Sequence, residues 1–408
     1  ELFSIFERGP EELSFCEAVH LMDFPLGEKQ QEMALESIEL DEHVSDAGLY
    51  CETWGKYDHA EKIYYKAFIL AEKRDKKLAN EDSQWSIAYY LQRMSGIALT
   101  HGKIAKSVEL GNKALEIILN MIEKNPSDET RMRLSTCYVR IGDGFERQGK
   151  IVEALEMYRK SLAIREKLSR ELGTLQSWRN LSLSYNHIGD ILKWQGDFIG
   201  SLEAYHKSLA IDKKLNFEFD TPESRRCLAI SYERVGDILE EHGKFVEALK
   251  MYRKSLTIRE KLNHEFGTPQ SLRNLAISYN RVGDILREQG NFIGALEMYR
   301  KSLSINEKLS LELDTPQSQS DLSVSYCDVG DILKEQGNFI GALEMYRKSL
   351  TIDEKLSLEL RTPSAYRNLM IACTHIISIL CDMEKCDEAL PFAKEALTIG
   401  EALATQLN

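Results

Sequence analysis

The sequence repeats itself at a fixed interval. Residues 291–313 return as residues 338–360, 47 positions later, with two differences, one of which is Asn306, which becomes Asp353. Such self-similarity indicates one supersecondary unit stacked on copies of itself, so it constrains the fold more than any other feature. Glycines mark the same interval along the chain, at Gly55, Gly102, Gly149, Gly196, Gly243, Gly290 and Gly337. We therefore expect about eight units.

Each unit carries the signals for two helices. Four units begin with a threonine followed by a proline, at Thr221, Thr268, Thr315 and Thr362. Threonine caps a helix N-terminus and proline suits its first turn. Apolar residues then recur three and four apart on both sides of the turn glycine, whereas no segment shows strand alternation. The pattern predicts an all-α fold, an α-solenoid of stacked antiparallel helix pairs, with helices roughly 30 Å long.

The repeat divides the chain into three parts. Residues 1–35 lie outside the period and are expected to form a helical cap or a docking segment. Residues 36–363 hold an array of about seven repeats. Residues 364–408 form a degenerate repeat that closes the array, because Ile377 and Glu384 stand where the two glycines of a unit are expected.

Composition limits the classes of partner. The net charge of −13 argues against nucleic acid, whose binding needs clustered lysine and arginine. No apolar run is long enough to cross a membrane, and no signal sequence opens the chain. Eight scattered cysteines without a CxxC spacing favour a reducing compartment, so we expect a cytoplasmic protein. Because the chain begins with Glu1, we expect it to be a piece of a longer protein with covalently linked domains.

Aligned units share four positions. A tyrosine is followed after four residues by a glycine, then by a small residue, then by a second tyrosine. These positions are Tyr138, Tyr185, Tyr232, Tyr279 and Tyr326; Gly142, Gly189, Gly236, Gly283 and Gly330; Ala154, Ser201, Ala248, Ala295 and Ala342; and Tyr158, Tyr205, Tyr252, Tyr299 and Tyr346. The pattern resembles the tetratricopeptide repeat over most of the chain, although the period is 47 residues and the family's is 34.

The resemblance implies a right-handed superhelix whose first helices line a concave face that holds a protein or peptide. It implies a non-enzymatic scaffold without a cofactor, acting as the sensor or adaptor arm of a larger intracellular protein. Two alternatives stay open. In the first, the chain is the regulatory region of an enzyme, a caspase-like protease or a signalling NTPase, whose catalytic domain lies elsewhere. In the second, it is a receptor for a short signalling peptide.

Close packing explains the shared positions. We expect the small Gly283 and Ala295 to let the two helices of a unit approach, with Tyr279 and Tyr299 filling the gaps between layers. A bulky side chain at Gly283 should therefore be destabilising.

A column of acidic residues follows the glycines, at Asp143, Asp190, Asp237, Asp284 and Asp331. Along a groove, these carboxylates would favour a basic or amine-bearing partner. The alternative is local compensation, because Arg140, His187, Arg234 and Arg281 stand three residues before four of them. Asp331 is expected to face Asp328 instead.

Further polar residues are candidates for contact with a peptide backbone. They are Asn186, Glu233 and Asn280, with Lys193 and Arg287 nearby, and the alternative is a packing ladder between helices. The family's carboxylate clamp of lysine and asparagine is not reproduced, which argues against chaperone tails. Cys373, His375, Cys381 and Cys386 are the clustered metal-ligand types, but helical spacing points Cys373 and His375 apart, so we expect no metal.

Overall fold

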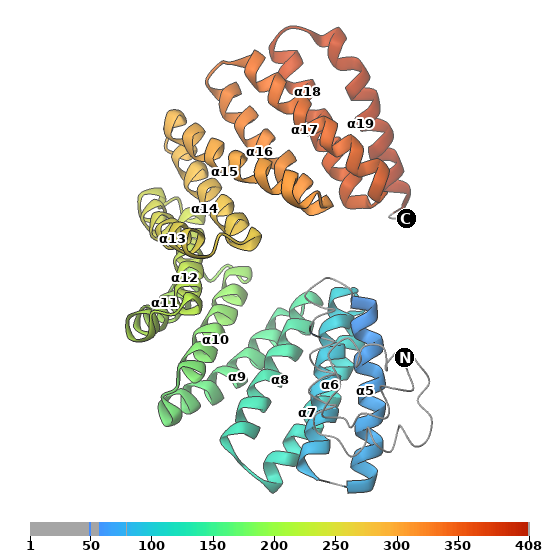
Figure 1. Ribbon diagram of the computed structural model, residues 1–408, viewed down its shortest axis with the longest axis vertical. Helices are drawn as coiled ribbons and strands as arrows, with labels where there is room; N and C mark the ends of the chain where they lie inside the picture. The colour runs from blue at the N-terminus through green and yellow to red at the C-terminus, as the bar shows by residue number, and fades with distance from the viewer. Residues whose placement is uncertain (1–48, 50–56, 79, 407–408) are drawn as a thin grey trace. The chain divides into compact units, whose positions relative to one another are not determined.

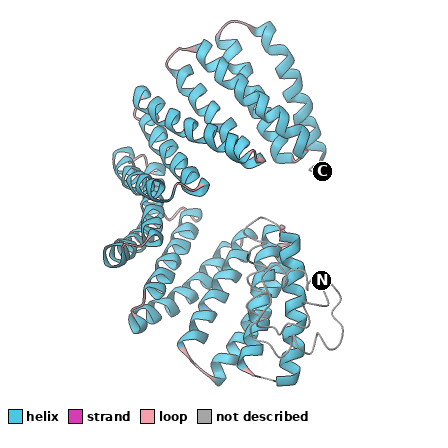
Figure 2. Cartoon of the chain, viewed as in Figure 1, coloured by secondary structure: helices cyan, strands magenta, loops and turns pink. Residues whose placement is uncertain are grey.

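The computed structural model describes residues 49, 57–78 and 80–406, and every regular element within them is a helix (Figure 2). The predicted cap at residues 1–35 lies outside the described residues. The helices in the first half are α5 (Tyr57–Leu78), α6 (Glu81–Thr100), α7 (Ile104–Lys124), α8 (Asp128–Arg147), α9 (Ile151–Leu172), α10 (Leu175–Trp194) and α11 (Phe198–Phe219). Those in the second half are α12 (Pro222–Glu241), α13 (Phe245–Phe266), α14 (Pro269–Glu288), α15 (Phe292–Leu313), α16 (Pro316–Glu335), α17 (Phe339–Leu360), α18 (Pro363–Asp382) and α19 (Cys386–Gln406).

The chain divides into two compact units, residues 1–211 and residues 212–408, with the boundary inside α11. In unit 1, α6 packs on α7 and α8 on α9; in unit 2, α12 packs on α13, α14 on α15, α16 on α17 and α18 on α19 (Figure 1). Within each unit, successive pairs also pack on one another, as α15 does on α16. The all-α solenoid of helix pairs is therefore confirmed, and the handedness of the whole superhelix stays a prediction. Below, the helix before the turn glycine is the first helix of a pair, and the other is the second helix.

Helix lengths and short connections account for the long period. The first helix α14 has 20 residues and the second helix α15 has 22, with three residues between them and two before α16. Threonine starts the first helices as predicted: the Thr268 side chain accepts a hydrogen bond from the Ser271 backbone N–H, with proline in the first turn. The turn glycine Gly290 has φ of 73°, a conformation that favours glycine.

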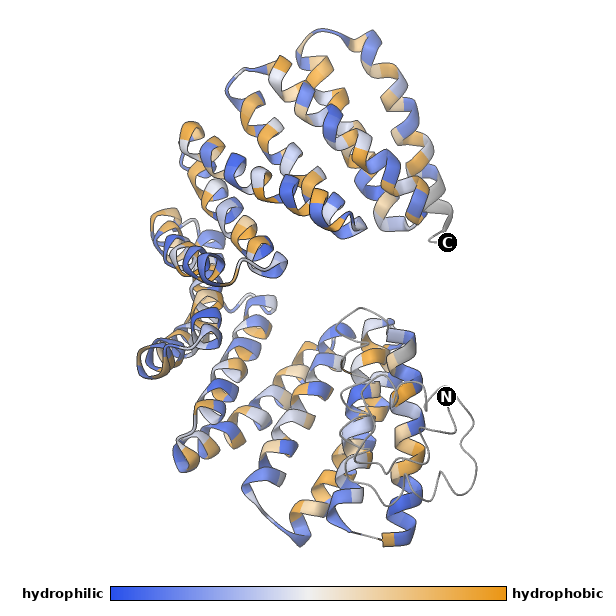
Figure 3. Cartoon of the chain, viewed as in Figure 1, coloured by the Kyte–Doolittle hydropathy of each residue, from blue (hydrophilic) through white to orange (hydrophobic). Residues whose placement is uncertain are grey.

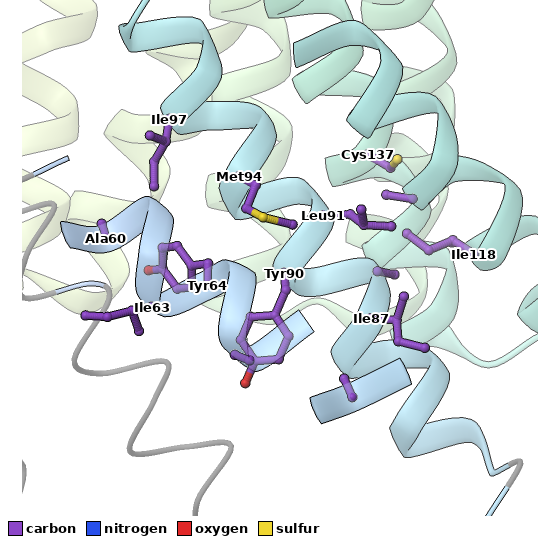
Figure 4. Close-up of a cluster of buried hydrophobic side chains, with 14 of the residues drawn as sticks. Ala60, Ile63, Tyr64, Ile87, Tyr90, Leu91, Met94, Ile97, Ile118 and Cys137 are labelled. Atoms are coloured by element: carbon purple, nitrogen blue, oxygen red, sulfur yellow. The ribbon is translucent and has the colours of Figure 1, made fainter. Parts of the chain in front are cut away.

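The core runs between consecutive helices. In unit 1, Tyr64, Tyr90, Met94, Ile97 and Ile118 form one buried cluster with side chains from α5, α6 and α7 (Figure 4). Most helices carry both apolar and hydrophilic residues along their length (Figure 3). This amphipathic pattern lets each helix bury one side against its neighbours and leave another in water.

The last pair, α18 and α19, keeps the turn without its glycine. Glu384 occupies the turn with φ of 60°, in the left-handed region that side-chain-bearing residues rarely adopt. The helix pair therefore forms although the sequence motif is degraded. The division at residue 364 stays a prediction.

Candidate functional site

The repeat glycine of each first helix lies against a tyrosine ring of the second helix. A Cβ atom at Gly283 would lie 2.8 Å from Cε1 of Tyr299, and one at Gly236 would lie 2.6 Å from the same atom of Tyr252. The corresponding glycines Gly142, Gly189 and Gly330 meet Tyr158, Tyr205 and Tyr346. The tyrosine ring therefore fills the space that the glycine leaves. The sequence pattern predicts that the small residue of the second helix lies against the glycine, and the nearest atoms belong to the tyrosine ring instead.

Each of these tyrosines donates a hydrogen bond to the aspartate that follows the glycine. The distances from the tyrosine hydroxyl to aspartate Oδ1 are 2.9, 2.6, 2.7, 2.7 and 2.6 Å for Tyr158–Asp143, Tyr205–Asp190, Tyr252–Asp237, Tyr299–Asp284 and Tyr346–Asp331. We call these pairs the tyrosine–aspartate bridges. Burial and the adjacent carboxylates raise the pKa of Tyr158 and Tyr252 above the ordinary value. Each aspartate of the acidic column therefore accepts a hydrogen bond from a tyrosine of its own helix pair.

The next first helix places a side chain over the ring of several bridges. His187 stacks on Tyr158 and His375 stacks on Tyr346, each with ring centroids 4.9 Å apart. Arg281 lies 5.7 Å from the centroid of the Tyr252 ring and forms an ion pair with Asp237. In these cases the following pair supplies the side chain that covers the ring, and Arg281 also brings a positive charge to Asp237.

This arrangement differs from the predicted local pairing. Arg140 and Asp143 do approach within one helix, at 4.0 Å, but Arg281 pairs with Asp237 of the preceding pair. Asp331 contacts Arg287 at 3.8 Å and His375 at 3.5 Å, so the expectation that it faces Asp328 is incomplete. The two residues of each of these longer-range contacts are 44 positions apart in the sequence, so the spacing of charges within one helix could not predict them.

Asp328 departs from the pattern. It stands in α16 at the position that His187, Arg281 and His375 hold in theirs. Burial raises its pKa to about 7, and the nearby Asp284 and Asp331 add to the shift while Arg287 opposes it. Asn280 Nδ2 donates a hydrogen bond to Asp328 Oδ2 at 3.1 Å. Unit 2 therefore holds three neighbouring carboxyl groups near one arginine.

We expect Asp328→Asn to stabilise the chain above pH 7. Because the folded-state pKa lies above the ordinary value, the folded state binds more protons between about pH 4 and pH 7, so stability falls as pH rises through this window and stays lower above it. Asparagine carries no charge and its Oδ1 can still accept from Asn280. A gain of about 1–2 kcal/mol at pH 8 and little gain at pH 4 are expected from thermal melts. An equal gain at both pH values would contradict the charge argument.

Some of the other predicted contact residues already interact with side chains of this chain. Asn186 is buried, with 6% of its surface exposed. Glu233 accepts hydrogen bonds from Ser255 at 2.6 Å and from Arg259 at 3.3 Å. Arg287 forms ion pairs with Glu335 and Asp331, and Lys193 is half-buried. Glu233 and Arg287 therefore link neighbouring helices.

Sequence reasoning missed an aliphatic column on the first helices of unit 2. Its members are Ile230, Ile277, Val324 and Ile371, which are 39%, 48%, 53% and 46% exposed. They recur every 47 residues, one on each first helix. The available signal was the run Leu275, Ala276, Ile277, since three consecutive residues cannot share one buried helix face. We call this set the aliphatic column.

The second helices present a solvated, self-paired surface at the repeated Tyr-Arg-Lys motif. Lys301 Nζ lies 2.7 Å from Glu297, and Lys348 Nζ lies 3.0 Å from Glu344. Lys301 also lies over the ring of Tyr279, whose hydroxyl donates to Glu260 at 2.9 Å. The lysines of this motif are therefore engaged with acidic and aromatic neighbours.

Two kinds of feature are absent from the described residues. No group of three or more histidine, cysteine, aspartate or glutamate side chains is arranged to hold a metal ion within residues 57–78 and 80–406. In the same part of the chain, no helix combines the length and the apolar character needed to cross a membrane.

The tetratricopeptide repeat family matches three overlapping segments, residues 180–261, 228–308 and 274–355. The chain contains tetratricopeptide repeats over residues 180–355. Its helix pairs follow the family's pattern of tyrosine, glycine, small residue and tyrosine with a longer, 47-residue period. The comparison with curated proteins found no match.

Two solved structures show the same fold. BtubC (BKLC) from P. vanneervenii is 17% identical with a TM-score of 0.51, over 62% of this chain and 92% of that chain. A Signal Transduction ATPase with Numerous Domains protein with a tetratricopeptide repeat sensor, from Pyrococcus horikoshii, is 14% identical with a TM-score of 0.55, over 96% of this chain and 54% of that chain. The chain thus spans about half the length of the Pyrococcus protein.

Proposed function

We propose that the chain binds a protein or peptide through its first helices and has no catalytic activity of its own. Tetratricopeptide repeats support a protein-binding scaffold. The single observation that carries the choice of surface is the aliphatic column of unit 2, because its branched apolar side chains are exposed on the first helices beside the polar residues three and four positions later. Repeated exposure of this kind is typical of an interaction site.

Polar groups border the aliphatic column and give it specificity. Residues three and four positions apart share a helix face. Asn280 and Arg281 follow Ile277 at these spacings, and Asp328 follows Val324. An extended peptide with apolar side chains on the column and a basic side chain near Asp284 and Asp328 fits this surface. The predicted contact residues Glu233, Asp237, Asn280, Asp284, Arg287 and Asp331 belong to this proposal, as do Asp143, Asn186, Asp190 and Lys193 in unit 1.

A matched pair of variants tests the surface. Peptides are first selected from a random library on the full chain. We expect replacement of Ile230, Ile277 and Val324 by serine to weaken binding of the selected peptides at least tenfold, measured by fluorescence anisotropy. The control replaces Val246, Ile293 and Ile340 by serine, since these second-helix residues are more exposed, at 59%, 82% and 75%. Loss of binding only in the control would assign the contact to the second helices and overturn the proposal.

We further propose that the scaffold acts in the cytoplasm as the sensor or adaptor arm of a larger protein. The Pyrococcus protein is described as carrying a tetratricopeptide repeat sensor within a signalling ATPase, which makes a regulatory region of an enzyme the nearest alternative. An antibody raised against this chain tests the covalent link. A cellular polypeptide well above 46.7 kDa is expected, and a single species at that mass would exclude it.

A further inference from the structure

The pair α6–α7 lacks the tyrosine–aspartate bridge. One period before Gly142, Asp143 and Tyr158 stand Ser95, Gly96 and Gly111. Without a ring to accommodate, Ser95 Oγ donates to the carbonyl oxygen of Ser107 at 2.8 Å. A Cβ atom at Gly96 would meet no other atom within 4 Å. The place that an aspartate holds in five later pairs is therefore open space in this pair.

A pocket of about 190 Å³ lies at this position in unit 1. Gly96, Ile97 and Gln92 of α6 line it, together with Arg93 and with Arg140 of α8. Figure 4 shows Ile97 and Tyr64 on neighbouring helices in this part of the fold. Arg93 Nε donates to the hydroxyl of Tyr64 at 3.3 Å, which fixes one wall. The pocket thus combines a mostly polar lining with guanidinium groups from two first helices.

In unit 2, the position equivalent to Gly96 carries an aspartate side chain. There, Arg281 forms an ion pair with Asp237 of the preceding pair. Arg140 is the counterpart of Arg281, and Gly96 is the counterpart of Asp237, with the same offset of 44 residues. Arg140 reaches Asp143 of its own helix at 4.0 Å, a carboxylate that already accepts from Tyr158. The carboxylate that pairs with the arginine in unit 2 has no counterpart at Gly96.

The buried amide of Gln92 adds a second polar group. Only 6% of the residue is exposed, and its Nε2 has no hydrogen-bond partner among the described residues apart from a weak interaction with the thiol of Cys137. Burial raises the pKa of that thiol to about 12, so it stays neutral and is a poor acceptor. A buried amide donor is costly to leave unsatisfied, and Gln92 lines the pocket, where a bound acceptor would satisfy it.

We propose that this pocket binds a side-chain carboxylate of the partner, an aspartate or glutamate that takes the place of the missing bridge aspartate. Arg140 supplies the charged hydrogen bonds, because guanidinium groups bind carboxylates in two-pronged geometry. Arg93 borders the site and need not give up its own contacts. The inference rests on the proposed function, since it assigns an acidic side chain of the partner to the first helices of unit 1.

Restoring the aspartate within the chain provides the sharpest test. Gly96→Asp places a carboxylate in the pocket and should compete with the partner's. Gly96→Ala is the matched control, because it adds a Cβ without charge. The probes are the blocked tripeptide acetyl-Ala-Asp-Ala-amide, its asparagine counterpart, and acetyl-Ala-Ala-Ala with a free chain end. Binding is followed by the side-chain amide signals of Gln92 in nitrogen-15 NMR spectra of the full chain.

We expect the aspartate probe to shift these signals, the asparagine probe to bind at least tenfold more weakly, and Gly96→Asp but not Gly96→Ala to abolish the shift. Arg140→Gln should weaken binding of the aspartate probe at least tenfold without changing the melting temperature by more than a few degrees. Equal binding by Gly96→Asp and Gly96→Ala would overturn the proposal, and so would preference for the free chain end. Either failure leaves the peptide test on the aliphatic column of unit 2 unaffected, so the two proposals fail separately.

Discussion

Gly283→Leu is expected to destabilise the chain by about 1–3 kcal/mol, the usual cost of overpacking a well-filled site. The new Cβ would lie 2.8 Å from the ring of Tyr299. That ring is 2% exposed and its hydroxyl is bonded to Asp284, so it has no space to swing aside. Because neighbouring pairs support one another, thermal unfolding should shift downward or separate into two transitions.

Gly96→Ala is the control for this experiment. Both glycines lie inside first helices, but a Cβ at Gly96 would meet nothing within 4 Å. Alanine there should stabilise the chain by about 0.5–1 kcal/mol, because glycine is the poorer helix former. Unchanged melting of Gly283→Leu, measured by circular dichroism, would show that the Tyr299 ring does not depend on the glycine.

Local features of the fold could be predicted from the sequence. The Thr268 cap, the proline after it and the turn glycine Gly290 act over a few residues, so their meaning is independent of the rest of the chain. The 47-residue period also predicted the spacing of the helix pairs in the described residues. The same reasoning placed tyrosine and glycine in one unit but could not show that the ring of Tyr299 covers Gly283.

Contacts between successive helix pairs could not be predicted from the sequence pattern. Local compensation, the alternative for the acidic column, would pair Arg281 with Asp284 on its own helix, and the structure joins it to Asp237, 44 residues earlier. Which side of a helix meets the next pair depends on how the pairs stack, and this is not encoded in the spacing along one helix. The exposure of Ile277 escaped prediction for the same reason, since a periodic apolar residue is usually buried.

The two near-identical repeats differ at a position whose importance only the structure reveals. Asn306 and Asp353 are buried in equivalent places on α15 and α17. Asn306 Nδ2 donates to Ser325 Oγ at 2.8 Å, while Asp353 Oδ2 accepts from Ser323 Oγ at 2.8 Å. The equivalent residues Arg165 and Arg259 are also buried. This polar position therefore changes its partner from pair to pair, although the surrounding packing is constant.

Arg259→Leu is expected to destabilise the chain by about 3 kcal/mol, the low end for breaking a buried ion pair. Arg259 Nε and Nη2 each lie 3.3 Å from an oxygen of Glu233. The arginine side chain is 8% exposed and the glutamate 19% exposed, so water replaces only part of the lost interaction. Ser255 and Ser278 would remain as the hydroxyl donors to a carboxylate whose charge is no longer balanced. The loss should appear as a lower urea midpoint of unfolding.

A double variant separates this charge effect from lost packing. Combining Arg259→Leu with Glu233→Gln removes both charges, and we expect it to recover more than half of the stability lost in the single variant, because an uncompensated buried charge costs more than the absent pair. Lys301→Leu is the matched surface control: its pair with Glu297 is exposed on both sides, and such pairs contribute about 0.5 kcal/mol. Strict additivity of the two substitutions would mean that Arg259 acts through its aliphatic stem. Glu233 would then be available to a partner, as the sequence first suggested.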